Sequence, residues 1–430
     1  EAVAPEALLG VLFYGYATGI FSSRKLEKAT HENLGMRYVA GGLHPDHDTI
    51  AHFRKTFLGE LQELFVQILL MAVLSGVLKL GNISLDGSKI HADASKSHAV
   101  SYKRLIELEA QLKAEVHELL TVGEQADQGE LQLPDDFVIA DEIAIRQERL
   151  VNLAQAKQVL EARAQERYAV EKAEYDAKLR EREQKSRQDH RKPNGRMPKP
   201  PQPGPGDKDQ YNFTDPDSRI MKNSTNQGVD QHYNVQVAND QESLLIVAQA
   251  LSNHPNDKQE AIPTLSTISP KVGKPEAVAM DNGYFSQTNI QACEKLGIDP
   301  FIATGREPHH LDWHTFFQEQ PEPPAEDANP KFKMAYKLQT EIGQAIYRLR
   351  KSTVEPVIGI IKEILGFRQF SLRGLWAVTG RAAWCLPQVP GFQLEAHAYL
   401  MDRAGSLLAR LLFEFCENRQ MKHACSPRFD

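Results

Sequence analysis

The order of short apolar runs and helical runs between residues 228 and 304 constrains the fold of this chain more than any other feature. The run GVDQHYNVQVAND favours a strand, because Tyr233, Val235 and Val237 recur at every second position. We expect, in chain order, strands at 228–240 and 244–248, a helix at 257–268, a strand at 277–280, a helix at 286–296 and a strand at 300–304. Strands interleaved with helices in this way predict an α/β fold, in which a mixed sheet is flanked by helices.

Changes of composition on both sides of this region set the expected domain boundaries. Apolar residues recur at helical spacing near the N-terminus, whereas a long stretch rich in Glu, Lys, Gln, Ala and Arg ends in the run PKPPQPGPGD, which cannot build a core. We expect an N-terminal helical domain at 1–80, an α/β domain made of 81–101 and 210–380, a helical insertion with a Pro/Gly-rich linker at 102–209, and an atypical tail at 381–430. The N-terminal domain could be a helix-turn-helix that enters a DNA major groove or a simple helical scaffold, and the sequence does not separate the two.

The composition is that of an ordinary globular protein, with 41% hydrophobic and 25% charged residues among 430. The four cysteines have no CxxC or Cys/His spacing, which argues against a disulfide framework and a structural zinc site and fits a reducing cytoplasm. The longest apolar run, 64–77, is too short to span a bilayer, which needs about 20 residues. We recognise no signal peptide, and because the chain begins with Glu1 instead of Met we expect a fragment or a trimmed product.

Two aspartates stand where predicted strands end. Asp86 follows an alternating run and precedes Gly87, and Asp281 directly follows the strand expected at 277–280. A carboxylate in this position is a common metal ligand, because ligands bind at the strand ends of open α/β sheets. The pair Asp86-Gly87 also has the pattern of a tight turn, and the local residues favour the turn.

A strongly basic stretch surrounds a third carboxylate, Glu355. Residues 331–373 contain nine Lys and Arg residues against three Glu residues, a surplus that suits a polyanion such as DNA although the whole chain has a net charge of −7. On a helix over 347–362, Lys351 and Lys362 would share a side with Glu355. Such a carboxylate can bind Mg²⁺ while its neighbours hold phosphates. Taken alone, the stretch is more simply interpreted as a surface helix with Glu–Lys pairs.

If Asp86, Asp281 and Glu355 converge, their oxygens could hold two Mg²⁺ ions about 3.5–4 Å apart. Sequence spacing does not prove that they meet. The other acidic candidates fit turns or helix caps better than metal ligands, and they are Asp93, Asp215, Asp217 and Asp240. The histidines around HPDHDTIAH have mixed spacing at a helix start and suit solvent or DNA contacts better than a metal cluster, and they are His44, His47 and His52.

Several motifs occur in a fixed order along the chain, namely LDGSKIHADAS, DPDSR, YNVQ, AMDNGYFS, FIATGR and KLQTEIGQAIYRLRKSTVEPVIGIIKEILGFRQFSLRGL. Together with YGYATGIFSSRKLE and HPDHDTIAHFRK nearer the N-terminus, they resemble the DDE transposases of bacterial insertion sequences. The resemblance covers most of the chain from residue 14 to about residue 380. It implies a ribonuclease-H-like catalytic core behind an N-terminal helical transposase domain.

The resemblance also implies the chemistry. Asp86, Asp281 and Glu355 would be the Asp-Asp-Glu triad, which binds two Mg²⁺ ions for which Mn²⁺ can substitute. Such an enzyme cuts the phosphodiester at the ends of its element and joins the freed 3′-OH to target DNA.

In the family, the glutamate belongs to a signature of Tyr, Arg, Glu and Lys, in which the Tyr and the two cations steady the DNA end. Here Lys362 has the expected spacing, and Lys351 occupies the Arg position with Arg350 beside it. The expected DNA contacts are Tyr347, Arg350, Lys351, Lys362, Arg368 and Arg373 around the glutamate, with Arg24 and Lys25 in the N-terminal domain. The implied partners are terminal inverted repeats and target DNA, bound by a homodimer or higher oligomer at the bacterial nucleoid, with no membrane association.

Two alternatives stay open. The first is a ribonuclease-H-like nuclease that cuts DNA without joining it. The second is a catalytically impaired transposase remnant that only binds DNA. The complete triad argues against a remnant, and the tail argues for one, because Pro387, Pro390 and Gly391 would break any helix there.

Overall fold

The computed structural model describes residues 3–129, 134, 136–189, 197–223, 228–305, 322–325 and 328–385. The chain divides into two compact units: the first is made of Glu1–Asp93 and Asp217–Asp430, and the second, Ala94–Pro216, is inserted into it. The predicted α/β fold with a mixed sheet and flanking helices is confirmed. The prediction that Pro387, Pro390 and Gly391 break a helix falls outside the described residues.

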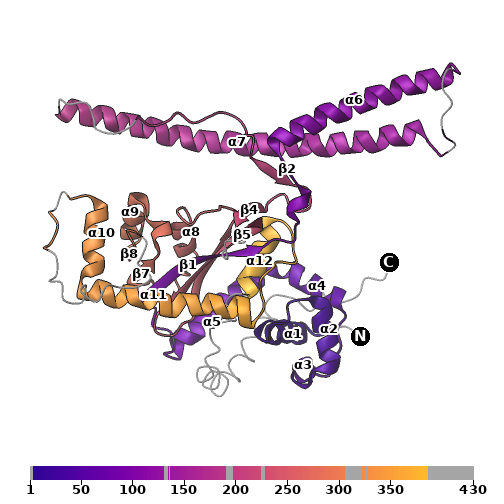
Figure 1. Cartoon of the computed structure of the whole chain (residues 1–430). Helices are drawn as coiled ribbons and strands as arrows, with labels where there is room; N and C mark the ends of the chain where they lie inside the picture. Colours follow the sequence, from indigo (N-terminus) through magenta and orange to yellow (C-terminus); the bar gives the residue numbers. More distant parts are fainter. Residues whose placement is uncertain are drawn as a thin grey trace. The chain divides into compact units, whose positions relative to one another are not determined.

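One mixed sheet forms the centre of the first unit (Figure 1). Its described strands are β1 (Asn82–His91), β4 (Arg219–Lys222), β5 (Val229–Asp240), β6 (Ile246–Ser252), β7 (Ala277–Met280) and β8 (Asp299–Ile302). The order is β4-β5-β1-β7-β8, and β6 pairs with β5 as well. Strand β1 is antiparallel to β5 and parallel to β7, which in turn is parallel to β8. The sheet is therefore antiparallel on one side of β1 and parallel on the other.

Helices precede the sheet, connect its strands and follow it. They are α1 (Pro5–Ala17), α2 (Ser23–Glu32), α3 (Leu34–Val39), α4 (His47–Thr56), α5 (Leu58–Leu74), α8 (Ala261–Leu265), α9 (Gln287–Lys295), α10 (Pro330–Gln339), α11 (Glu341–Gly359) and α12 (Leu375–Cys385), with the short helices η2 (Asn282–Tyr284) and η4 (Ile360–Ile364, a π-helix). Side chains cap two of these helices at their first turn: Asp46 accepts from the Thr49 amide in α4, and Ser286 accepts from the Asn289 amide in α9. None of the described helices is long and apolar enough to cross a membrane.

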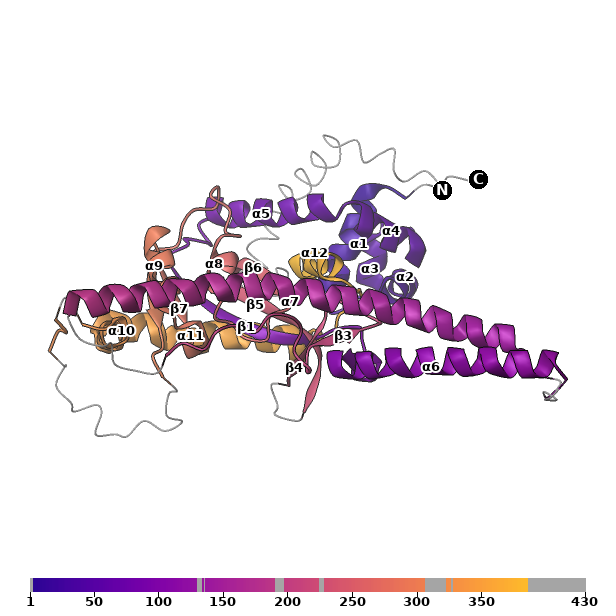
Figure 2. The same ribbon diagram turned by 90° about the horizontal axis from the view of Figure 1, so that it is seen from above.

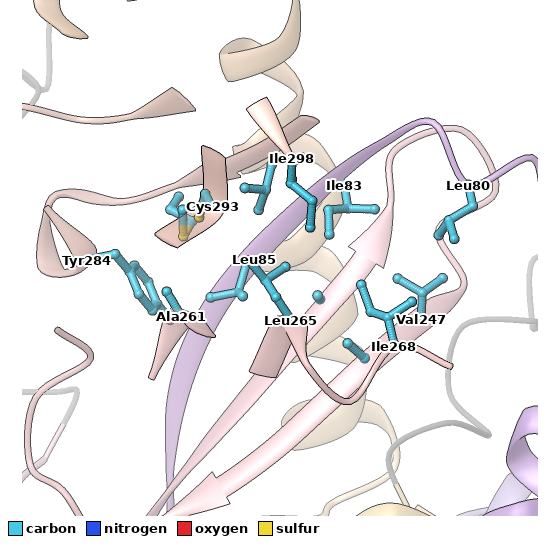
Figure 3. Close-up of a cluster of buried hydrophobic side chains, with 14 of the residues drawn as sticks. Leu80, Ile83, Leu85, Val247, Ala261, Leu265, Ile268, Tyr284, Cys293 and Ile298 are labelled. Atoms are coloured by element: carbon cyan, nitrogen blue, oxygen red, sulfur yellow. The ribbon is translucent and has the colours of Figure 1, made fainter. Parts of the chain in front are cut away.

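Alternation along the strands separates two apolar layers. Val278 and Met280 of β7 belong to a buried cluster with residues of β1, α8 and α9, such as Leu85, Leu265 and Cys293. Figure 3 shows part of this cluster. The alternate residues of β7, Ala277 and Ala279, pack with Phe301 and with Ile346 of α11. Helix α11 therefore covers the face opposite to α8 and α9.

Two predicted elements are wrong in detail. The helix expected at 257–268 is limited to Ala261–Leu265, because Pro263 lacks an amide hydrogen and is tolerated only in a first turn. The strand around Asp86 does not end there: β1 runs on to His91 and pairs with β5 along its length. Asp86 therefore lies within a strand and not at a turn.

The second unit is a helical hairpin on a two-stranded base. Its described elements are η1 (Lys96–His98), β2 (Ala99–Ser101), α6 (Tyr102–Asp127), α7 (Ile139–Asp189) and β3 (Gln210–Asn212). Leu105 and Leu112 of α6 pack with Leu153 and Leu160 of α7, and the two helices lie side by side in Figures 1 and 2. Strands β2 and β3, which the sequence-based boundaries gave to the α/β domain, belong to this unit.

One short segment of the first unit holds both points at which the insertion is attached. Nε of Arg373 contacts Oδ2 of Asp93 at 3.0 Å, where the chain leaves the first unit. The backbone amide of Leu375 donates to Oδ2 of Asp217 at 2.9 Å, where the chain returns. The first unit thus fixes both ends of the insertion by itself.

Candidate active site

Two of the three predicted carboxylates lie on neighbouring strands. Leu85 of β1 is in register with Met280 of β7, and the two strands are parallel. Asp86 and Asp281 are the next residues along these strands, so both emerge at the same level of the sheet. The negative charge of Asp281 is one of the causes that raise the pKa of Asp86. The structure therefore brings these two residues together.

The side chain of Asp86 points to the face covered by α11. Leu85 belongs to the cluster on the opposite face, so its neighbours in the strand turn the other way. Accordingly, Ser84 receives a hydrogen bond from Oγ1 of Thr353 at 2.9 Å, and Oδ2 of Asp86 receives one from Nη1 of Arg350 at 3.1 Å. Both partners belong to α11.

Arg350 connects the third carboxylate to the first. It lies in the buried stripe of α11 with Ile346 and Val354, and its side chain is 8% exposed. Its Nη2 is 3.6 Å from Oε1 of Glu355, whose side chain is 52% exposed. One guanidinium therefore contacts both Asp86 and Glu355, although Glu355 itself lies at the rim of the site.

Burial makes it costly to ionise the two aspartates. Desolvation raises the pKa of Asp86 to about 6, the charge of Arg350 opposes this rise, and the charges of Asp281 and Asp257 add to it. The pKa of Asp281 is also raised, mainly by desolvation. Two adjacent, desolvated carboxylates favour a cation between them, since it would offset their repulsion.

We expect Asp86→Asn to stabilise the metal-free protein. The pKa of Asp86 is raised from 3.8 to about 6, so the folded state disfavours the charged form. Wild-type stability is consequently lost as the pH rises from about 4 through about 6. One pKa unit corresponds to about 1.4 kcal/mol, so Asn should raise the free energy of unfolding by roughly 2–3 kcal/mol at pH 7.5. Urea titrations at pH 4 and pH 7.5 measure this, and a gain of similar size at both pH values would contradict it.

Sequence reasoning missed a fourth carboxylate, Asp257. Its Oδ1 accepts hydrogen bonds from Nδ2 of Asn234 and Nε2 of Gln236, each at 2.8 Å. Its charge is among the causes that raise the pKa of Asp86 and of Asp281. The signal in the sequence was on β5, where these two amides occupy the positions between Tyr233, Val235 and Val237 in the alternating run.

The predicted DNA contacts near Glu355 occupy different environments. The Tyr347 ring lies 5.8 Å from the guanidinium carbon of Arg350, and Lys351 is exposed. Lys362 lies in η4 and is half-buried, and burial lowers its pKa, with the charge of Arg368 adding to the effect. Arg350 is the predicted DNA contact that reaches the carboxylates of Asp86 and Glu355.

The remaining predicted cations contact other groups or are exposed. Arg368 pairs with Glu363, and Arg373 pairs with Asp93. Arg24 and Lys25 are exposed on α2. The structure does not bring these residues into contact with the carboxylates of the site.

The alternative ligands have local partners. Oδ2 of Asp240 accepts from the amide and hydroxyl of Ser243, which is a turn contact. Asp217 accepts from the Leu375 amide at the start of α12, Asp93 pairs with Arg373, and Asp215 is buried in the second unit. His44 stacks on His31 at 3.9 Å and His47 contacts Glu27 at 2.8 Å, while Nε2 of His52 lies 3.4 Å from Oγ1 of Thr56.

The donor set of the site suits a hard divalent cation by its chemistry. Asp86, Asp281 and Glu355 offer carboxylate oxygens only, which Mg²⁺ and Mn²⁺ prefer. Within the described ranges, no group of three or more His, Cys, Asp or Glu side chains is drawn together as a metal cluster. The positive charge next to Asp86 is the guanidinium of Arg350.

Two family models match the chain. The model described as "Transposase domain (DUF772)" covers residues 1–56, and the one described as "Transposase DDE domain" covers residues 208–386. No curated protein and no solved structure matches. The transposase DDE domain has a ribonuclease-H-like fold, and the family generally uses divalent metal ions and acts on DNA. The chain belongs to the DDE transposases.

Proposed function

We propose that this transposase cleaves the ends of an insertion sequence and transfers the freed strands to target DNA, with Asp86, Asp281 and Glu355 as its metal-binding triad. One observation carries the proposal. Asp86 and Asp281 follow paired residues of parallel strands, and Arg350 joins Asp86 to Glu355 across the α11 face. Asp281 and Glu355 fall within residues 208–386, the part of the chain that the transposase DDE model matches, and these contacts connect Asp86 to them.

We propose Mg²⁺ as the metal, with two ions bound and Mn²⁺ as a substitute. When bound, the ions would activate the attacking oxygen and stabilise the leaving 3′-oxygen. Asp86 and Asp281 would supply the inner ligands, because their backbones are fixed in or next to the sheet. Glu355 would supply the outer one, since its exposed side chain has room to turn inward. Arg350 would hold Asp86 toward the α11 face.

The DNA would lie along the basic stretch around Glu355. We propose that Tyr347, Arg350, Lys351 and Lys362 hold the cleaved end, with Arg368 and Arg373 beyond them. Exposed Arg24 and Lys25 on α2 would contact the terminal inverted repeat. A homodimer or higher oligomer would bring both ends of the element together at the nucleoid.

The test uses duplexes that carry the ends of the element encoding this chain, incubated with the protein and a target plasmid. We expect nicked and joined products with Mg²⁺ or Mn²⁺, and neither product with EDTA. Nicks without joined products would overturn strand transfer and indicate a nuclease. Binding without any cleavage would indicate a protein that only binds DNA.

A further inference from the structure

We propose that Asp257 is a positioning residue of this active site, which acts through Gln236 and Tyr284 on the turn that carries Asp281. The inference rests on the proposed function, because it concerns the geometry of one member of the triad. The motifs around the triad do not single out Asp257, whereas its hydrogen bonds with Asn234 and Gln236 do.

Asp257 is bound by two amides that the sheet holds rigidly. Asn234 and Gln236 point from β5 to the same oxygen, Oδ1 of Asp257, and both amide side chains are fully buried. Hydrogen bonds to a charged acceptor are stronger than neutral ones, and a buried amide that loses its acceptor is left unsatisfied. Asp257 therefore fixes the side chains of two residues in the central part of the sheet.

The contact with Asp257 determines how the Gln236 amide is oriented. Nε2 must face the carboxylate, so Oε1 faces the opposite way, where it accepts a hydrogen bond from the Tyr284 hydroxyl. Tyr284 is fully buried, and its hydroxyl needs this acceptor. If the Gln236 amide turned over, its NH₂ group would face the hydroxyl and both contacts would be weakened. Asp257 thus holds Tyr284 through Gln236.

Tyr284 closes the turn that begins at Asp281. The side chain of Asp281 caps η2 by accepting from the Gly283 amide at 2.8 Å, and its carbonyl accepts from the Tyr284 amide at 3.3 Å. Space for Asp257 depends on glycine at position 87. A Cβ at Gly87 would lie 2.6 Å from Oδ1 of Asp257, and one at Gly283 would lie 3.6 Å from Oδ2 of Asp257. Asp257 is therefore packed between β1 and the turn.

The experiment compares Asp257→Ala with Asp257→Asn by hydrogen exchange of residues 277–286 and by the rate of end nicking with Mn²⁺. Alanine removes the acceptor, so we expect clearly faster exchange at Gly283 and nicking about 10–100-fold slower, as for other residues that orient metal ligands. Asparagine keeps an acceptor oxygen for both amides, so it should restore exchange and nicking to within about threefold of wild type. Asp299→Asn, an exposed residue at the opposite end of a neighbouring strand, is the control and should change neither.

A second comparison tests the route through Gln236. Tyr284→Phe removes the hydroxyl that binds the other side of the Gln236 amide. In the double variant Asp257→Ala with Tyr284→Phe, we expect the amides of residues 277–286 to exchange no faster than in the more affected single variant. The reason is that both substitutions break the same chain of contacts. Additive effects would overturn the route. If Asp257→Ala does not fold, Gly87→Ala replaces it, since the new Cβ would displace both Asp257 and the Gln236 amide from their contact and leave every polar group present.

The remaining outcomes are also decisive. If Asp257→Asn is as impaired as Asp257→Ala, the charge of Asp257 matters and a positioning role is wrong. If Asp257→Ala leaves the exchange of the turn unchanged, Asp257 does not hold it. A wild-type protein that binds DNA but never nicks it would contradict the proposed function alone, since hydrogen exchange still decides the role of Asp257.

Discussion

Asp281→Asn should reduce metal-dependent nicking of the element end at least about 1,000-fold, the order expected when a group that acts in the transition state is lost. The substitution removes the charge that binds the metal and keeps the shape of the side chain. The asparagine oxygen can still accept from the Gly283 amide, which is the contact that caps η2. We therefore expect an unchanged fold and unchanged affinity for the duplex. Single-turnover nicking and fluorescence anisotropy with the same labelled duplex measure the two effects.

Asp299→Asn is the matched control for this prediction. Asp299 begins β8 and pairs with Ala277, at the end of these two parallel strands opposite to Asp281, and its side chain is 56% exposed beside Lys337. It should nick DNA at the wild-type rate. Equal rates for wild type and Asp281→Asn would remove Asp281 from the triad, whereas a loss of duplex binding would show that the substitution disturbs more than the metal site.

Arg350→Met is expected to destabilise the metal-free protein by about 3–5 kcal/mol at pH 7.5. Methionine preserves the packing of the α11 stripe but leaves Asp86 buried without its partner, and breaking a buried ion pair from one side is costly. Since Arg350 lowers the pKa of Asp86, that pKa should rise above about 6 in the variant. The loss of unfolding free energy relative to wild type should then be smallest at acidic pH, where Asp86 is protonated, and should grow as the pH rises.

Urea titrations of wild type, Arg350→Met and Arg348→Met across pH 5 to pH 8 test this expectation. Arg348 is exposed on the same helix, so its replacement should change the free energy of unfolding by no more than about 0.5 kcal/mol. In the double variant Asp86→Asn with Arg350→Met, most of the deficit should disappear, because no buried carboxylate is left unpaired. A deficit that is independent of pH and persists in the double variant would attribute the effect to packing.

Features that depend on neighbouring residues could be predicted from the sequence. The strand at 277–280 was found because four apolar residues precede an acidic turn, and the helix expected at 286–296 is observed at Gln287–Lys295, where the side chain of Ser286 caps the first turn. The α/β order followed from such local signals. Asp281 was therefore placed correctly at the end of its strand, whereas Asp86 was wrongly placed at a strand end, and the register of the two strands depends on pairing between distant segments.

Features that depend on packing between distant segments could not be predicted. Gly87 indicated a turn, whereas it provides the space that Asp257 and Gln236 occupy beside an unbroken strand. Helical spacing drew attention to Lys351 as the partner of Glu355. The buried face of α11 includes Arg350, one residue earlier, and the sheet beneath it explains why that cation reaches Asp86.

The attachment of the inserted unit has a consequence for how such a chain can change. Asp93 and Asp217 are bound by Arg373 and Leu375, which are only two residues apart in the sequence. The first unit therefore holds the two ends of residues 94–216 close together, as the ends of a closed loop. The entropy of closing a loop grows only with the logarithm of its length. Lengthening, shortening or exchanging the hairpin should therefore cost the ribonuclease-H-like core little, which leaves this part of the protein free to diversify.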